Sequence, residues 1–117
     1  MELRFVFEPR KEASCCLQLT NKTNGIIAFN VKINQNKYIV RPSQGTMGPC
    51  SRRYVVVTLS AQAAAPPYMR CDDKLLVQST GVSQDHVIDY QELFEKAMAN
   101  KVVDEVKLPI IYVTLDQ

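Results

Sequence analysis

Few residues of this 117-residue chain have the types that catalysis requires. Ser43, Cys50 and Asp72 could act as nucleophiles or acids, but His86 is the only imidazole and lies in a polar loop. A hydroxyl or thiol nucleophile is activated by a base within hydrogen-bond reach, and no spacing in this sequence places a base beside one. We therefore expect no enzyme, and we expect His86 to be a surface residue.

The four cysteines are Cys15, Cys16, Cys50 and Cys71. None forms a C-x-x-C pair, and with a single histidine the sequence predicts no metal site and no cofactor. Cys15 and Cys16 are neighbours in a predicted strand, so one should point inward and the other outward. We interpret all four as reduced thiols of a cytoplasmic protein, because the core looks large enough not to need disulfides.

Composition narrows the class of protein. Fourteen basic and twelve acidic residues leave a net charge of +2, too mild for a nucleic-acid-binding protein. A hydrophobic content of 46% is enough for a globular interior. No apolar run could span a bilayer and the N-terminus lacks a signal-peptide core, so we expect a soluble chain. Its length predicts one domain, residues 1–117.

Alternating apolar and polar residues predict seven short strands. Residues 21–25 are expected to form a turn, with Asn24-Gly25 suited to positive φ, and residues 43–51 a loop. Pro42 should end one strand, and Pro109 implies that the last strand has an edge position or a bulge. The predicted strands cover residues 3–8, 15–20, 27–33, 38–41, 53–60, 73–79 and 106–115.

One helix is predicted near residues 89–99. Asp89 can cap it with Glu92 in the reciprocal position, and apolar residues recur at helical spacing from Tyr90 to Met98. We expect this helix to pack on the edge of the sheets rather than to bind a partner, and the Pro-Pro segment 61–68 to be an extended connection. Many short strands with little helix predict an all-β, immunoglobulin-like sandwich of seven strands.

Several segments resemble the major sperm protein (MSP) domain, particularly that of plant relatives of VAP, the VAMP-associated protein. The most specific are Pro42-x-x-Gly45-x-Met47-x-Pro49 and the run Asp73 to Gln78. The resemblance covers nearly the whole chain and implies the MSP fold without catalytic activity. The other matching segments are ELRFVFEPRKEASCCLQLTNKT, AFNVK and VKLPIIYV.

The resemblance also implies a function. VAP-type domains bind FFAT motifs, short peptides with two phenylalanines in an acidic tract, on a basic sheet face. They thereby tether partner proteins at the cytosolic side of the endoplasmic reticulum. The matching positions here are Lys32, Lys74 and Leu76, and we expect Lys37 and Arg41 to add long-range attraction for acidic ligands.

Strand alternation agrees with this assignment, because it points Lys32, Lys74 and Leu76 outward. Leu76 is then an apolar side chain on a polar face, where an aromatic ring could bind between positive charges. The alternative is an ordinary solvated sheet face without a ligand.

Two differences from the family leave other functions open. After Val31-Lys32 the family typically continues Thr-Thr-x-Pro, whereas this chain has Ile33-Asn34-Gln35-Asn36. The family's first short strand is also missing, which would leave a sandwich edge open for pairing with a second chain. The alternative is therefore a divergent MSP domain, for example from a kinase fusion, that recognises another protein or forms a homodimer. Structural polymerisation, as in nematode sperm, is a third class.

Overall fold

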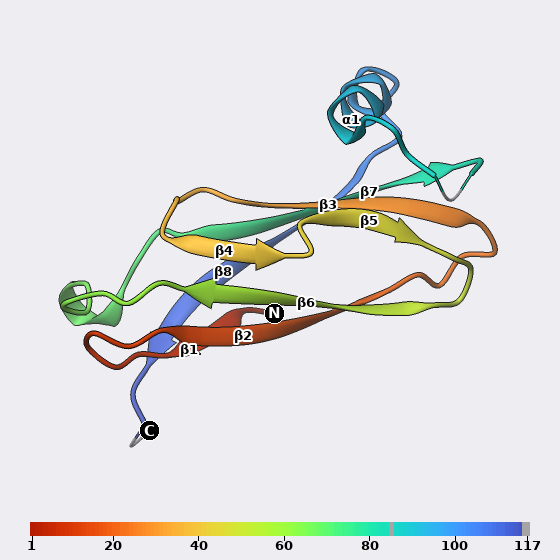
Figure 1. Ribbon diagram of the computed structural model, residues 1–117. Helices are drawn as coiled ribbons and strands as arrows, with labels where there is room; N and C mark the ends of the chain where they lie inside the picture. Colours follow the sequence, from red (N-terminus) through yellow and green to blue (C-terminus); the bar gives the residue numbers. More distant parts are fainter. Residues whose placement is uncertain (85, 116–117) are drawn as a thin grey trace.

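The computed structural model describes residues 1–84 and 86–115. Its strands form two stacked sheets (Figure 1), one of five strands in the order β1-β8-β7-β3-β5 and one of three in the order β2-β6-β4. The predicted all-β sandwich with a short helix is confirmed. The strands are β1 (Leu3–Val6), β2 (Ala13–Thr20), β3 (Ile26–Ile33), β4 (Tyr38–Arg41), β5 (Gln44–Met47), β6 (Arg52–Leu59), β7 (Lys74–Val82) and β8 (Asp104–Val113).

The core lies between the two sheets. Phe29 of β3 and Leu75 of β7 face Val55 and Val57 of β6, and all four are almost completely buried. Along β1, Leu3 and Phe5 are buried while the residues that follow each of them are exposed. This period of two is what a sheet with one buried face requires, and it explains why alternation located most strands.

The strand β5 lies where the sequence predicted a loop, so the described residues form eight strands rather than seven. It pairs antiparallel with β3, and Gly45 lies opposite Phe29. A Cβ at Gly45 would lie only 3.0 Å from two ring carbons of Phe29. The absence of a side chain at Gly45 therefore lets β5 lie directly over this core ring.

The turn between β2 and β3 forms as predicted, but a side chain stabilises it rather than a backbone with positive φ. It crosses from one sheet to the other, and its stabilising residue is Asn21, which is 1% exposed. The Asn21 amide donates to the carbonyls of Gly25 at 2.9 Å, Met47 at 3.2 Å and Gly48 at 2.9 Å. The prediction of positive φ at Asn24-Gly25 is wrong, because neither residue has it. The buried side chain, not a special backbone conformation, shapes this connection.

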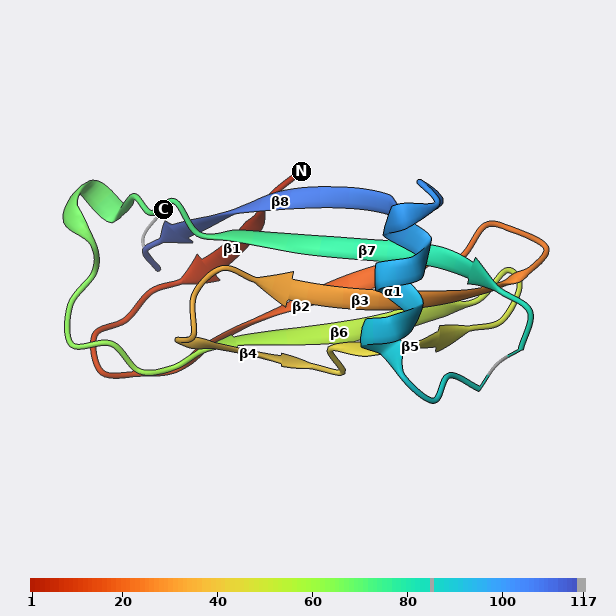
Figure 2. The same cartoon turned by 90° about the horizontal axis from the view of Figure 1, so that it is seen from above.

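The helix α1 (Tyr90–Ala99) forms as predicted, and the Asp89 side chain accepts a hydrogen bond from the backbone N–H of Glu92 at 3.1 Å. Its position was predicted wrongly. It crosses the outer face of the five-stranded sheet (Figure 2) instead of packing on an edge. The outward positions Ala28 and Thr80 are opposite each other and buried, at 0% and 5% exposure. Their burial shows that this part of the outer face is covered rather than open to solvent.

Pro109 lies at an edge, as its missing N–H requires. The backbone N–H of Ile110 donates to the backbone carbonyl of Asp73, on the β7 side, at 3.1 Å. Because successive N–H groups of a strand point to opposite sides, the nitrogen of Pro109 points to the other side of β8. There the pairing with β1 begins only at Ile110, opposite Leu3. The connection before β7 contains one 3₁₀ turn, η1 (Pro67–Met69), which the sequence did not predict.

Candidate functional site

Two lysines flank a leucine on the outer face of the five-stranded sheet. Lys32 of β3 lies opposite Leu76 of β7, and Leu76 lies opposite Lys107 of β8. Directly opposed residues on neighbouring strands are about 4.5–5.5 Å apart, so the three side chains form one continuous row. Both lysines are exposed and Leu76 is half-buried. Strand alternation predicted the outward direction of Lys32 and Leu76, while Lys107 was not predicted.

Lys74 adds a third positive charge to this row. It is exposed and lies two residues before Leu76 on the same face of β7, roughly 7 Å away along the strand. In residues 1–84 and 86–115, neither Lys74, Lys32 nor Lys107 forms a salt bridge. We call Lys32, Lys74, Leu76 and Lys107 the lysine face. It offers an apolar side chain surrounded by unpaired ammonium groups.

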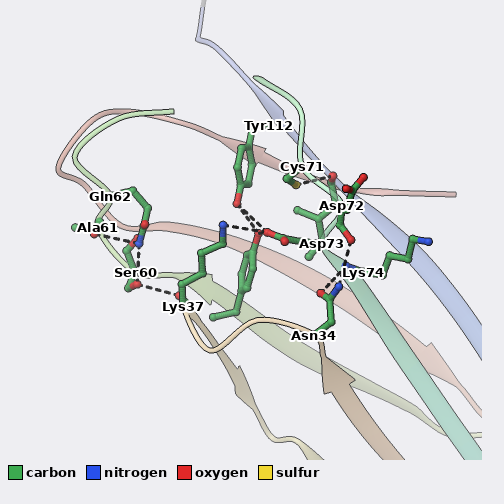
Figure 3. Close-up of polar contacts among 12 residues, drawn as sticks. Asn34, Lys37, Ser60, Ala61, Gln62, Cys71, Asp72, Asp73, Lys74 and Tyr112 are labelled. Carbon is green, nitrogen blue, oxygen red and sulfur yellow. Dashed lines mark hydrogen bonds and ion pairs between the residues drawn. The ribbon is translucent and has the colours of Figure 1, made fainter. Parts of the chain in front are cut away.

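A buried carboxylate fixes the start of β7 immediately below this face. Asp73 points inward and is 6% exposed, whereas Lys74 points away from it (Figure 3). Its Oδ2 atom accepts hydrogen bonds from the Tyr38 hydroxyl at 2.6 Å and the Tyr112 hydroxyl at 3.4 Å. The ammonium group of Lys37 lies 3.2 Å from the same oxygen. The two tyrosine hydroxyls also bond to each other.

These contacts set the protonation states of the cluster. Burial by itself would raise the pKa of Asp73, but the hydrogen bonds from Tyr38 and Lys37 outweigh it, and the pKa lies below its ordinary value. Burial would lower the pKa of Lys37, yet the bond to Asp73 raises it overall. Burial, then the bond to Asp73, raises the pKa of the Tyr38 hydroxyl. The cluster therefore holds one ionised carboxylate and one ammonium ion at neutral pH.

Asn34, in the segment that differs from the family pattern, fastens β3 to the start of β7. Its amide nitrogen donates to the carbonyl of Asp72 at 3.2 Å, and its amide oxygen accepts from the backbone N–H of Lys74 at 2.9 Å. The last backbone pair of this ladder is Ile33 with Leu75. The Asn34 side chain thus extends the ladder by one step and holds the backbone of Lys74.

Residues 1–102 match the family model of the MSP (major sperm protein) domain. The chain belongs to the MSP domain family. This MSP domain is 44% identical over 118 residues to Vesicle-associated protein 1-1 of Arabidopsis thaliana, an alignment covering 97% of the chain and 45% of the relative. It is 42% identical to Vesicle-associated protein 3-1 of the same plant, covering 97% and 77%.

Solved structures show the same fold. The MSP domain superimposes on SSP-19, an MSP-domain protein like family member of Caenorhabditis elegans, with a TM-score of 0.60, 26% identity and coverage of 86% of this chain and 87% of that one. For WR4, another MSP family member of that organism, the TM-score is 0.66 at 20% identity, with 90% and 88% covered. The chain spans about half the length of the first four curated relatives it matches. No helix within residues 1–84 and 86–115 is long and apolar enough to cross a lipid bilayer.

Two predicted residues lie away from the lysine face of this MSP domain. Arg41 of β4 belongs to the three-stranded sheet, where it lies opposite Val56 and is exposed on the opposite side of the sandwich. Strand alternation cannot tell to which sheet a strand belongs, and the long-range attraction expected of Arg41 stays a prediction. Lys37 lies in the loop between β3 and β4, and its charge is paired with Asp73. Its first role is to neutralise a buried carboxylate.

The residues considered for chemistry lie apart from one another in the MSP domain. His86 is exposed, as predicted, and so are Ser43 and Cys50. Of the two neighbouring cysteines, Cys15 is half-buried and Cys16 exposed, which confirms their opposite directions. Among the described residues no group of three His, Cys, Asp or Glu side chains could hold a metal ion. Membership of the MSP family supports a protein-interaction module.

Proposed function

We propose that the domain binds short acidic, phenylalanine-containing peptides of the FFAT type on the lysine face. The observation that supports this best is the row in which Lys32 and Lys107 flank Leu76. An aromatic ring that covers Leu76 would remove apolar surface from water, which is the main favourable term in such a contact. The lysine ammonium groups beside it attract carboxylates and raise the association rate. The proposed activity is binding, without a chemical step.

The lysine face suits an acidic ligand better than a neutral one. Three lysines without carboxylate partners repel one another at short range, and an acidic peptide would relieve this repulsion. Exposed charges are screened over about 8–10 Å at physiological salt, so this attraction should weaken as salt is added. Leu76, being apolar, should contribute a part of the affinity that salt does not remove.

Isothermal titration calorimetry with a synthetic peptide, two adjacent phenylalanines in an Asp/Glu tract, tests this proposal. The double variant Lys74→Asp/Leu76→Asp should bind at least about tenfold more weakly, because it reverses one charge and removes the apolar anchor. Lys107→Asp should weaken binding about threefold to tenfold. Absence of heat for the unchanged domain at high concentration would refute the proposal.

A matched control lies on the opposite side of the sandwich. Ile39 is 47% exposed and Arg41 is exposed two residues later on β4, which is the same combination of an apolar and a basic residue. Ile39→Asp/Arg41→Asp makes the same change in net charge and also removes a solvent-accessible apolar side chain, but leaves the lysine face intact. It should keep the affinity of the unchanged domain. An equal loss in both double variants would mean that only net charge matters.

We also propose a place in the cell for the protein. By analogy with VAP, it would act as an adaptor that holds partner proteins at the cytosolic face of the endoplasmic reticulum. The similarity to plant vesicle-associated proteins supports this. Imaging of the fluorescently tagged full-length protein with a marker of this membrane would test it, and a signal elsewhere would refute it.

A second candidate function is self-association through the open part of β8. Only Ile110–Val113 of β8 pair with β1, so in the described residues the backbone from Asp104 to Pro109 has no strand on that side. Val106 is 54% exposed there. Unpaired strand edges can pair with a second chain. Light scattering would show a concentration-dependent dimer that Val106→Lys abolishes; a monomer at all concentrations would exclude it.

A further inference from the structure

A groove runs between α1 and the outer face of the five-stranded sheet. It exists because the helix crosses β7 and β3 instead of lying along them (Figure 2). Its volume is about 590 Å³, within the range of ligand-binding clefts. Asn30, Gln44 and Gln78 line it from the sheet, Gln91 and Glu95 from α1, and Lys32 lies at its border with the lysine face.

The sheet side of the groove is a row of amides. Gln44 of β5 lies opposite Asn30 of β3, which lies opposite Gln78 of β7. Asn30 donates to Gln78 at 3.4 Å, and Gln78 donates to Glu105 at 2.9 Å. Within the described part of the chain, the amide of Gln44 has no hydrogen-bond partner. Side-chain amides carry both donors and acceptors, the pair of groups that an extended peptide backbone presents.

The charges of the groove exclude an acidic occupant. Of the residues that the structure describes, Lys32 is the one basic residue that lines it. On the helix side lies the carboxylate of Glu95, which accepts from Gln91 at 3.1 Å. At the other side Glu105 accepts from the buried Gln78. A chain segment that continues past Lys32 into the groove therefore meets amides, the carboxylate of Glu95 and the side chains of Tyr90, Phe94 and Met98. This lining favours uncharged or apolar residues over acidic ones.

The groove is continuous with the lysine face. The amide row lies two residues along the strands from the row of Lys32 and Leu76, roughly 7 Å away. Two residues of extended chain cover this distance. We propose that the groove binds the uncharged segment adjoining the phenylalanines of the same peptide. This inference rests on the proposed function and adds to it a second contact that selects the sequence outside the acidic tract.

Calorimetry with three synthetic peptides tests the inference: the acidic two-phenylalanine core, the core extended by uncharged residues, and the core extended by Asp and Glu. The extension is added at each end in turn. One of the uncharged extensions should raise affinity about tenfold, the equivalent of one or two hydrogen bonds, whereas the acidic extension at that end should not. The variants Gln44→Trp and Gln91→Trp fill the groove and should abolish this gain while the core binds as before.

Gln18→Trp is the matched control, because Gln18 is exposed on β2 of the opposite sheet. It should leave the gain unchanged. If the core binds but no extension improves affinity, or if the gain survives in both groove variants, the inference is wrong and the proposed function stands. If the core itself does not bind, the proposed function fails and the inference fails with it.

Discussion

Replacing Tyr38 by Phe should destabilise the domain mainly at neutral pH. The Tyr38 hydroxyl donates to Asp73 at 2.6 Å, while the ring packs on Phe5 with centroids 5.7 Å apart. Tyr38→Phe keeps the ring and removes the shortest of three donors to a carboxylate that is 6% exposed. A hydrogen bond to a charged group contributes about 1.5–3 kcal/mol. Because Lys37 and Tyr112 still face the carboxylate, we expect a loss of about 2 kcal/mol in the free energy of unfolding.

The loss should depend on pH because Asp73 titrates. Its pKa is lower in the folded state than in the unfolded chain, where it is about 4. Ionisation of Asp73 therefore stabilises the fold above about pH 4, and this contribution disappears as the pH falls through the folded-state value. In acid, Tyr38 would bond to a neutral carboxyl, which contributes only about 1 kcal/mol. The difference between variant and unchanged domain should shrink accordingly.

Urea denaturation followed by far-ultraviolet circular dichroism, in a series from neutral pH to the lowest pH at which the domain stays folded, measures both quantities. Tyr54→Phe is the control, because Tyr54 is 60% exposed and its change should stay within about 0.5 kcal/mol. A loss for Tyr38→Phe that stays constant over the whole pH series would refute the assignment of Asp73 as the ionised acceptor. A loss no larger than that of Tyr54→Phe would refute the importance of the bond itself.

Two further predictions concern residues that shape the elements around the lysine face. Gly45→Ala should cost about 1–3 kcal/mol, because its Cβ would lie 3.0 Å from the Phe29 ring, whereas Gly81→Ala, with nothing within 4 Å, should be nearly neutral in the same denaturation assay. Asp89→Ala should cost about 1 kcal/mol, because it removes the acceptor for the Glu92 N–H, and Asp89→Asn should restore most of it. An equal effect of the two glycine variants, or no difference between Ala and Asn at the helix cap, would contradict these assignments.

Local patterns predicted the elements better than their arrangement. The alternation in β1, β2, β3, β6 and β7 was correct because one face of each strand is buried in the core. The strand β5 was missed, because four residues between Pro42 and Pro49, one of them Gly45, carry no apolar alternation. The helix was found from its cap and its period, but no local pattern states which surface it covers. It crosses β7 and also β3, which lies far from it in sequence.

The same limit applies to the lysine face. The outward direction of Lys32, Lys74 and Leu76 follows from each strand by itself. Lys107 could be assigned to the lysine face only from the strand register, which puts it opposite Leu76. The sequence did not show that the strand of Arg41 joins the other sheet, or that Lys37 pairs with Asp73, 36 positions away along the chain. Register and sheet membership are properties of the whole fold, so a single strand pattern cannot supply them.

The hydrogen bonds of Asn34 affect which groups are available to bind acidic ligands. Its amide oxygen and one of its two N–H groups bond to the backbone at the start of β7, so it offers a ligand at most one N–H donor there. Under the proposed function, the carboxylates of the peptide would then be recognised by the ammonium groups of Lys32, Lys74 and Lys107. Such recognition depends on charge more than on fixed hydrogen-bond geometry, since ammonium groups on flexible stems accept many positions of a carboxylate. Selection among acidic sequences must therefore come from neutral contacts, which are the apolar surface of Leu76 and the amides of the groove beside α1.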